Sequence, residues 1–429
     1  MDKKIAVIGA GATGLAAART LAAGGFRVDV YEKDDYIGGL CVSHKTSGAD
    51  VEKIYHHIFT SDSHIVGLAG ELGLALSWKA PRDAFYAGGK IFPFTSPVDL
   101  LKFSHLPFIY RVTMGMLVLR AGLEKKIPEG VTAREWISAK AGRPVYEKVW
   151  KPLMESKFDA DADDISAAWI WGKFKLRGST RADKVGREMF GYMDGGFMLL
   201  LEALAKEIES YGGKVISSAE VKKLVKSIGG WEVCGNEYDC VLFTGPPASF
   251  ANFADGFAGR DYEAKCLGVS YKANLCALLE TRAPLSKYYW TTVADKTVPF
   301  VAVIEHTNMV DKKFYGGSNL VYLTRYLDAS DPLYAAPDDE VRRLFVDGLK
   351  KIYPSFTEAD CVSFTLTRSR YAQPVVRLGY RETIPEVRTP ARGLYLSSMA
   401  QIYPEDRGMN YAVREGFRAA EIIKSDFIA

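Results

Sequence analysis

The chain has 429 residues, of which 48% are hydrophobic and 25% are charged, and its formal net charge is +3. This length is typical of about two or three domains, and the composition is that of an ordinary globular protein. The small net charge gives no footprint of a nucleic-acid-binding protein, and it decides neither for nor against a phosphorylated substrate or an anionic surface.

The six cysteines show neither a CxxC pattern nor a metal-ligand spacing, so we predict no metal site. Scattered thiols are typical of a reducing compartment. The first predicted strand follows Met-Asp-Lys-Lys directly, which leaves no room for a signal peptide. We therefore expect a cytoplasmic protein.

The stretch Lys4–Gly39 carries the strongest functional signal. The apolar run Ile5–Ile8 predicts a buried parallel strand, and Ala12–Gly24 predicts a helix rich in small residues. Between and within them, glycines follow the GxGxxG spacing of dinucleotide-binding turns. These glycines are Gly9, Gly11 and Gly14.

Each glycine of this motif has a mechanical reason. Gly9 permits the tight turn, Gly11 lets a pyrophosphate approach the backbone, and Gly14 lets helix and strand pack closely. The diphosphate is then expected at the helix N-terminus, beside Ala12 and Thr13, where free N–H groups and the helix dipole favour negative charge.

A second predicted strand, Arg27–Tyr31, ends at Glu32, and Lys33 follows it. A carboxylate at this point can accept hydrogen bonds from both hydroxyls of an adenosine ribose. It would repel a 2′-phosphate, so NADP is disfavoured. A glycine turn in an α/β core without a ligand is the alternative interpretation.

Gly38 and Gly39 lie six and seven residues beyond Glu32. The combination of GxGxxG, an acid and this Gly-Gly pair resembles the FAD-binding N-terminus of the flavin amine oxidase superfamily. That superfamily includes monoamine oxidases, protoporphyrinogen oxidase, phytoene desaturases and UDP-galactopyranose mutase. The resemblance implies FAD as cofactor, with Gly38, Gly39 and Leu40 passing close to its phosphate and ribityl arm.

The resemblance also implies the fold: a Rossmann-type FAD-binding domain of the two-dinucleotide-fold kind, with an inserted mixed helical and antiparallel-sheet substrate domain. A helical pattern from Ser96 to about Leu176 and strand alternation in Lys265–Tyr334 agree with it. The expected segments are 1–88, 193–262 and 389–429 for the FAD-binding domain, 89–192 for the helical part and 263–388 for the sheet part.

Two adjacent histidines lie in Val51–Asp62, and on an extended segment they cannot face the same way. The sequence Tyr-x-His-Ile-Phe resembles the segment of UDP-galactopyranose mutase whose histidine lies against the isoalloxazine. His57 matches that histidine, and Ile58 follows it. The family usually has a further histidine after the phenylalanine, where this chain has Thr60.

Two later segments resemble the remainder of the FAD site. In the family, the residue that matches Val221 offers its backbone to adenine, and the strand ending at Thr244 stops close to the dinucleotide. Near the C-terminus, an acid that matches Asp406 (or Glu405) bonds the ribityl chain, and the helix start at Met409 faces the flavin N1/O2 locus.

The cysteine that tethers flavin in monoamine oxidases has no counterpart within Ser397–Ile402. We therefore expect non-covalent FAD.

No substrate residue follows firmly from the sequence. Arg325, Arg370 and Arg377 suit bidentate capture of a phosphate or carboxylate, and Tyr371 is placed to close a pocket over the flavin. We take His57, Arg325 and Tyr371 as the catalytic candidates. The polar cluster at 305–308 is interpreted either as a pocket lining or as a solvated hairpin tip.

Three functions agree with these observations. The first is an FAD-dependent oxidoreductase that transfers hydride from a small-molecule substrate to flavin N5. The second is a nucleotide-sugar mutase or isomerase that uses reduced flavin N5 as a nucleophile, and the third is a flavoprotein without turnover. The apolar run Phe103–Leu119 is shorter than the roughly 20 residues of a membrane span, which leaves peripheral membrane contact as an alternative to a packed helix. The oligomeric state stays open.

Overall fold

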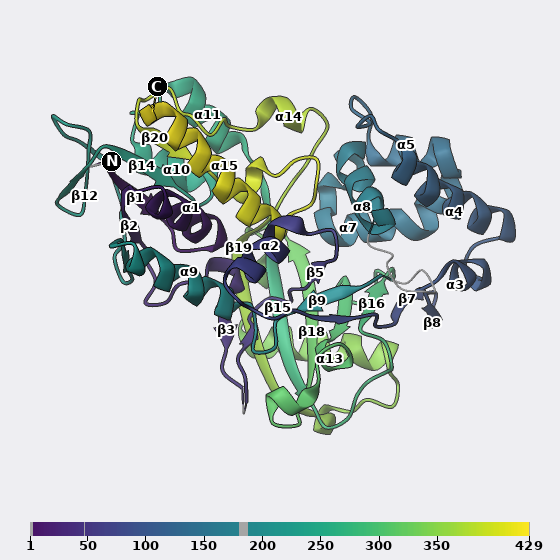
Figure 1. Cartoon of the computed structure of the whole chain (residues 1–429). Helices are drawn as coiled ribbons and strands as arrows, with labels where there is room; N and C mark the ends of the chain where they lie inside the picture. The colour runs from purple at the N-terminus through teal and green to yellow at the C-terminus, as the bar shows by residue number, and fades with distance from the viewer. Residues whose placement is uncertain (1–2, 47, 180–187, 429) are drawn as a thin grey trace.

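A computed structural model describes residues 3–46, 48–179 and 188–428. The chain builds a nucleotide-binding domain that holds both ends of the described chain, a long mixed sheet in the middle and a group of helices beside that sheet (Figure 1). The predicted α/β architecture with an inserted helical and sheet domain is confirmed.

The nucleotide-binding domain is built on a five-stranded parallel sheet with the order β10-β2-β1-β14-β20. Strands β1, β14 and β20 are short apolar runs that are almost wholly buried, which is typical of a parallel sheet covered by helices. Segments from the beginning, the middle and the end of the chain meet in it. The strands are β1 (Lys4–Ile8), β2 (Arg27–Tyr31), β10 (Lys214–Ile216), β14 (Cys240–Phe243) and β20 (Leu394–Leu396).

One face of this sheet is covered by helices from both ends of the chain. Helix α1 (Ala12–Ala23) packs against α15 (Met409–Ile428), where a Cβ on Gly416 would lie 2.5 Å from the Thr13 carbonyl oxygen. Only glycine permits this approach. Helices α2 (Ser63–Glu71) and α9 (Met198–Ser210) complete the layer.

The opposite face is covered by α10 (Pro247–Ala254) and α11 (Arg260–Gly268). A small antiparallel sheet packs beside them through its buried Trp231. Its strands are β11 (Val225–Lys226), β12 (Trp231–Val233) and β13 (Asn236–Tyr238).

The middle of the molecule is a seven-stranded sheet with the order β19-β15-β18-β17-β16-β7-β8. Helix α13 (Asp338–Ile352) covers one face, and the short α12 (Pro332–Ala335) lies beside it. The strands are β7 (Asp83–Ala87), β8 (Lys90–Pro93), β15 (Tyr271–Thr281), β16 (Trp290–Val293), β17 (Ala302–Glu305), β18 (Asn319–Leu327) and β19 (Cys361–Pro374). Because β7 and β8 form one hairpin in this sheet, the boundary predicted at residue 88 cuts through that hairpin.

The helices beside this sheet pack against its β7–β8 edge (Figure 1). The first begins as predicted, because Ser96 caps it in a capping box with Asp99 and Pro97 occupies its first turn. The helices are α3 (Pro97–Lys102), α4 (Phe108–Leu123), α5 (Ala133–Ala141), α6 (Arg143–Val145), α7 (Lys151–Phe158) and α8 (Ala167–Ser179).

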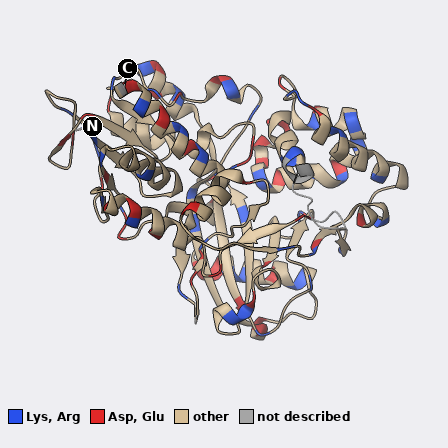
Figure 2. Ribbon diagram, in the orientation of Figure 1, with Lys and Arg blue, Asp and Glu red and all other residues tan. Residues whose placement is uncertain are grey.

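Short elements join these parts. The remaining ones are β3 (Ser43–His44), β4 (Val51–Glu52), β5 (Ile58–Phe59), β6 (Ser77–Lys79), β9 (Phe190–Tyr192) and α14 (Tyr380–Thr383). Basic and acidic side chains are interspersed over all parts of the ribbon, in agreement with the small net charge (Figure 2).

Candidate active site

The glycine turn after β1 is as tight as its motif predicts. Gly9 has a φ of +108°, and a Cβ on Gly14 would lie 2.0 Å from the Gly9 carbonyl oxygen. A Cβ on Gly11 would meet only the Cα of Gly39, at 4.0 Å. Helix α1 begins with Gly11 as its N-cap and no capping side chain among the described residues, so its first N–H groups stay available for a ligand.

Glu32 lies directly beside this turn and is buried. Its Oε2 accepts a hydrogen bond from Ala10 N at 2.9 Å, and its Oε1 accepts one from Asp34 N at 3.1 Å. Each carboxylate oxygen keeps lone-pair capacity for another donor. The side chain of Lys33 points to solvent, where it pairs with Asp34 at 3.5 Å.

The segment that leads to Val221 pairs with the backbone of Glu32 and Asp34. Ser218 N donates to the carbonyl of Asp34, and Ala219 N donates to that of Glu32, both at 2.8 Å. The backbone near Val221 therefore lies beside the predicted ribose position.

The Gly-Gly pair closes on the glycine turn. Gly38 N donates to the Ala10 carbonyl at 3.0 Å, and a Cβ on Gly39 would lie 3.4 Å from the Gly11 Cα. Both residues have positive φ, which favours glycine. Leu40 lies in the short turn that follows, before Cys41.

Thr244 fixes the turn from the neighbouring strand. It ends β14 and donates its hydroxyl to the Ile8 carbonyl at 2.9 Å. A Cβ on Gly9 would lie 2.6 Å from this hydroxyl oxygen, so Thr244 in this position requires glycine at position 9.

The two adjacent histidines face opposite ways, as predicted. The His57 Nδ1 lies 2.9 Å from the Tyr289 hydroxyl, and its ring packs at 4.6 Å between centroids on Phe190. The His56 Nε2 lies 3.8 Å from the Cys41 thiol, next to the Gly-Gly segment. The structure thus brings His56 to the segment predicted to follow the flavin. The flavin contact of His57 stays a prediction.

His56 is a neutral imidazole. Burial, together with the charge of Arg407, lowers its pKa to about 4. Its Nδ1 lies 2.7 Å from the Ile54 carbonyl, which only accepts, so Nδ1 carries the hydrogen and Nε2 presents a lone pair.

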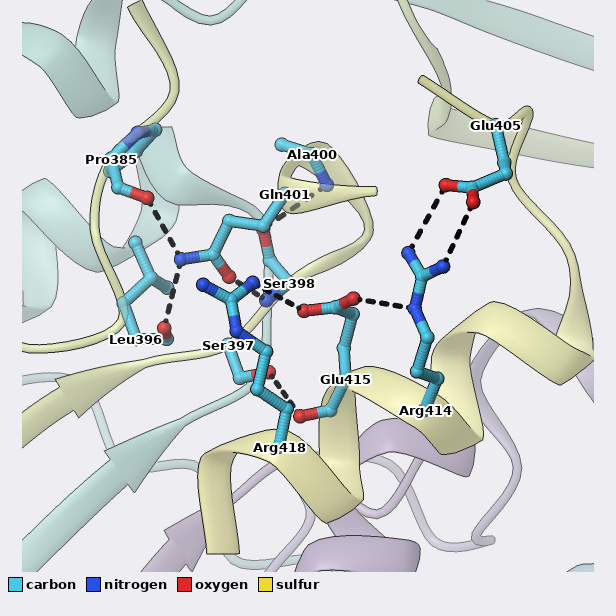
Figure 3. A network of polar contacts seen from close by, with 10 residues as sticks. All are labelled: Pro385, Leu396, Ser397, Ser398, Ala400, Gln401, Glu405, Arg414, Glu415 and Arg418. Atoms are coloured by element: carbon cyan, nitrogen blue, oxygen red, sulfur yellow. Dashed lines mark hydrogen bonds and ion pairs between the residues drawn. The ribbon is translucent and has the colours of Figure 1, made fainter. Parts of the chain in front are cut away.

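The segment between β20 and α15 is held by a network of buried polar groups (Figure 3). Gln401 donates to the carbonyls of Pro385 and Leu396, both at 3.0 Å, and accepts from Ser398 N at 2.7 Å. Glu415 on α15 is buried and pairs with two arginines at 3.0 Å. The arginines are Arg414, which also binds Glu405, and Arg418. These contacts fix where α15 starts, at Met409.

Asp406 in this segment faces the helices beside the sheet. Its carboxylate lies 3.0 Å from the Lys157 Nζ and 2.6 Å from the Lys173 Nζ. It also accepts hydrogen bonds from Trp169 Nε1 at 3.0 Å and Gln373 Nε2 at 3.1 Å. Burial opposes its ionisation, but the charges of the two lysines hold the pKa of Asp406 well below its usual range. These contacts engage both carboxylate oxygens of Asp406 with protein groups. The ribityl contact of Asp406 stays a prediction.

A model of the family described as flavin-containing amine oxidoreductase matches residues 12–424. The chain belongs to the flavin-containing amine oxidoreductase family. The residues present fit a flavin dinucleotide, since the glycine cradle, the acceptor at Glu32 and the open N-terminus of α1 are the groups that a dinucleotide needs.

Two curated relatives are coproporphyrinogen III oxidases. The chain is 23% identical over 305 residues to that of Staphylococcus aureus, covering 61% of this chain and 64% of that protein. It is 28% identical over 173 residues to that of Propionibacterium freudenreichii, covering 38% of this chain and 33% of that protein. The chain thus matches less than two thirds of the length of either relative.

Solved structures share the fold over nearly the whole chain. Reduced UDP-galactopyranose mutase superposes with a TM-score of 0.77 at 17% identity, covering 99% of this chain and 96% of that chain. Putrescine oxidase bound to putrescine gives 0.73 at 16% identity, with 99% of both chains covered. An oxidoreductase from Methanosarcina mazei gives 0.75 at 18% identity, covering 97% and 100%.

Within this flavin family fold, Arg325 does not reach the predicted flavin site. Strand β18 alternates, so Tyr322 and Tyr326 share one face and Arg325 lies on the α13 face. There it donates to the Pro299 carbonyl at 3.2 Å. These contacts give no support to the candidate catalytic role of Arg325, and Tyr326 lies on the opposite face of β18.

The other substrate candidates have mainly structural contacts. Tyr371 packs edge-on against Tyr271, with ring centroids 5.4 Å apart. Arg377 pairs with Asp161 at 2.6 Å, and Arg370 is exposed. The catalytic role of Tyr371 stays a prediction.

The cluster at 305–308 is not a solvated tip, because Glu305 and His306 are buried in a hydrogen-bond network. Glu305 accepts from the backbone of Leu285 at 2.8 Å and of Ser286 at 3.1 Å, and also from the Ser286 hydroxyl. The His306 Nε2 lies 2.8 Å from the Tyr315 hydroxyl. This network holds the turn that carries Tyr289, the partner of His57.

Sequence reasoning missed the residues that meet around Asp406. They come from α7, α8, β18 and the α15 segment, and only their placement in space makes them a site. These missed residues are Lys157, Trp169, Lys173, Tyr326 and Arg407. His56, beside Cys41, was missed separately.

Proposed function

We propose that the chain binds FAD non-covalently and oxidises a small molecule, with flavin N5 as the hydride acceptor. The observation that carries this proposal is that the glycine turn after β1 and the segment after β20 leave the parallel sheet at the same end of its strands, with only β14 between them. Ligands of open α/β sheets bind at the carboxyl ends of the strands, where these segments lie.

Each part of the site has a role in holding the cofactor. The N–H groups at the start of α1 would bind the diphosphate, and Glu32 would accept from the ribose hydroxyls. The start of α15 at Met409 would place its dipole where negative charge develops on reduction.

The thiols favour non-covalent binding. Burial raises the pKa of Cys41 to about 12, and that of Cys276 to about 12 as well, so both stay protonated and poorly nucleophilic. All six cysteines are free, which supports the proposed location in the reducing cytoplasm.

The test is the cofactor itself. Purified protein should be yellow, and denaturation should release FAD that is free of the chain. A colourless protein that takes up no FAD would refute the proposal, and flavin that stays with the denatured chain would refute non-covalent binding.

A mutase that uses reduced flavin on a nucleotide sugar is the second candidate. The segment around His56 favours it, because an uncharged imidazole lies beside the flavin segment. Such a ring can accept a hydrogen bond from a sugar hydroxyl. The two candidates differ in what turns over. Ring-form exchange of UDP-galactopyranose by anaerobically reduced protein supports the mutase, whereas reoxidation only by an added electron acceptor supports the oxidoreductase.

We also propose peripheral membrane contact through α3 and α4. No helix in the described part of the chain is long and apolar enough to cross a bilayer. Yet Phe108, Ile109 and Leu123 are 64%, 61% and 81% exposed on α4, and exposed Lys125 and Lys126 follow it. Large exposed apolar side chains beside basic ones are typical of a contact with an anionic bilayer.

Co-sedimentation with phosphatidylglycerol vesicles tests this contact. We expect binding that a Phe108→Ser/Leu123→Ser variant loses and that an Ile228→Ser variant, changed at an exposed residue far from α4 in the sequence, retains. Equal binding of all three proteins, or none by the unchanged protein, would contradict it.

A further inference from the structure

Arg407 is a partly buried guanidinium that shares the negative charge of Asp406 with two lysines and keeps an unsatisfied donor. Its Nη2 donates to the Tyr326 hydroxyl at 2.7 Å, and its buried Nε has no hydrogen-bond acceptor. The carboxylate of the adjacent Asp406 is bound by Lys157 and Lys173. One carboxylate thus serves three cations, and burial of the excess positive charge is costly because its desolvation is only partly repaid.

A second cation lies on the same aromatic ring. The Lys157 Nζ is 5.4 Å from the centre of the Tyr326 ring, and the Arg407 guanidinium is 5.9 Å from it. Asp406 is the one carboxylate in contact with these groups among the described residues, so positive charge exceeds negative charge around Tyr326. His56 next to Arg407 is neutral and adds no compensation.

This charge lies where three parts of the chain come together. Arg407 lies in the segment before α15, and Tyr326 lies on the middle sheet, with its hydroxyl 3.1 Å from that of Tyr55. Lys157 comes from α7, in the helices beside the sheet. The three side chains therefore meet where the cofactor segment, the sheet and the helices converge.

We propose that Arg407 and Lys157 form an oxyanion subsite that binds a carboxylate or a phosphate of the substrate. The guanidinium fork suits either group because both present two oxygens to parallel N–H donors. The subsite rests on the proposed function, since it positions the anionic end of the molecule that the flavin oxidises. The chemistry predicts an anionic substrate class for this chain.

The test is a titration of the FAD-loaded full-length chain with two probes, pyrophosphate and glutarate, at ionic strength held constant with sodium chloride. The flavin difference spectrum reports binding. We expect saturable binding of at least one probe, and the stronger probe identifies phosphate or carboxylate as the anion. Arg407→Gln should weaken it at least tenfold and Arg407→Lys less, because lysine keeps the charge but loses the fork.

Lys157→Gln gives a second, independent variant, for which we expect a weakening of several-fold. Arg388→Gln is the matched control, because Arg388 is a surface arginine paired with Asp426 and should leave probe affinity unchanged. Equal affinity in Arg407→Gln and in the unchanged protein would overturn the subsite. No binding of either probe by yellow protein would overturn it too.

A different result would assign Arg407 to the cofactor. If Arg407→Gln shifts the flavin reduction potential but leaves probe affinity unchanged, the guanidinium serves reduced flavin and the subsite is wrong. Failure of the proposed function is seen separately, as protein without FAD. In that case probe binding is measured as a rise in the thermal unfolding temperature. An equal rise in Arg407→Gln and in the unchanged protein would still refute the subsite.

Discussion

Replacing Glu32 by glutamine tests the cofactor site most directly, because glutamine keeps the shape and one acceptor oxygen but removes the charge. In the structure both carboxylate oxygens are used by backbone N–H groups, from Ala10 at 2.9 Å and Asp34 at 3.1 Å. The glutamine amide group can satisfy only one of them. The N–H group that loses its acceptor should lower the free energy of unfolding of the FAD-free protein by about 1 kcal/mol.

The effect on FAD is larger. Hydrogen bonds to a charged group contribute roughly 1.5–3 kcal/mol each, so weakening the bonds to the ribose hydroxyls should raise the FAD dissociation constant by about 10- to 100-fold. The assay is release of free flavin, followed by its fluorescence on dilution of the loaded protein.

Glu71 provides the matched control for this experiment. It lies on α2, its side chain is 57% exposed, and it pairs with Arg19 at the surface. Glu71→Gln should leave FAD release unchanged, and Glu32→Arg should weaken FAD binding far more than Glu71→Arg. Equal release from the Glu32 and Glu71 variants would refute the assignment of Glu32 to the ribose.

Three further changes test the surrounding structure. Gly14→Ala places a Cβ 2.0 Å from a carbonyl oxygen and should cost about 3 kcal/mol or more in unfolding free energy, with loss of FAD; Gly67→Ala, with nothing within 4 Å, should stabilise α2 by roughly 0.5–1 kcal/mol. Burial raises the pKa of Glu305 from 4.5 to about 7. Between these two pKa values the folded protein binds one proton more than the unfolded chain, so the free energy of unfolding falls as pH rises from 4.5 to about 7. Urea titrations of Glu305→Gln over this pH range should show a smaller fall than those of the unchanged protein. Asp406→Asn removes the carboxylate shared by two lysines and should lower the unfolding free energy by about 2 kcal/mol, whereas Asp338→Asn, at an exposed pair, should cost less than about 1 kcal/mol. A similar loss in the two aspartate variants would contradict the buried role of Asp406.

The sequence determined the parts of the site in which neighbours along the chain restrict each other. The glycine spacing, the acid after the second strand and the Gly-Gly pair lie within Lys4–Gly39, so strand, turn and helix geometry are sufficient to place them. The start of α15 at Met409 was predictable for the same reason, because a polar turn between a strand and an amphipathic helix limits where the helix begins.

Only the tertiary structure decided which side chains meet opposite the cofactor segments. The alternation of β18 places Tyr326 and Arg325 on opposite faces of the sheet, and a register shift of one residue reverses such an assignment. Asp406 and Lys157 are 249 residues apart in the chain, so no local pattern joins them. Their contact depends on how the helices dock on the sheet, a packing that burial of side chains from distant segments decides and that no single segment encodes.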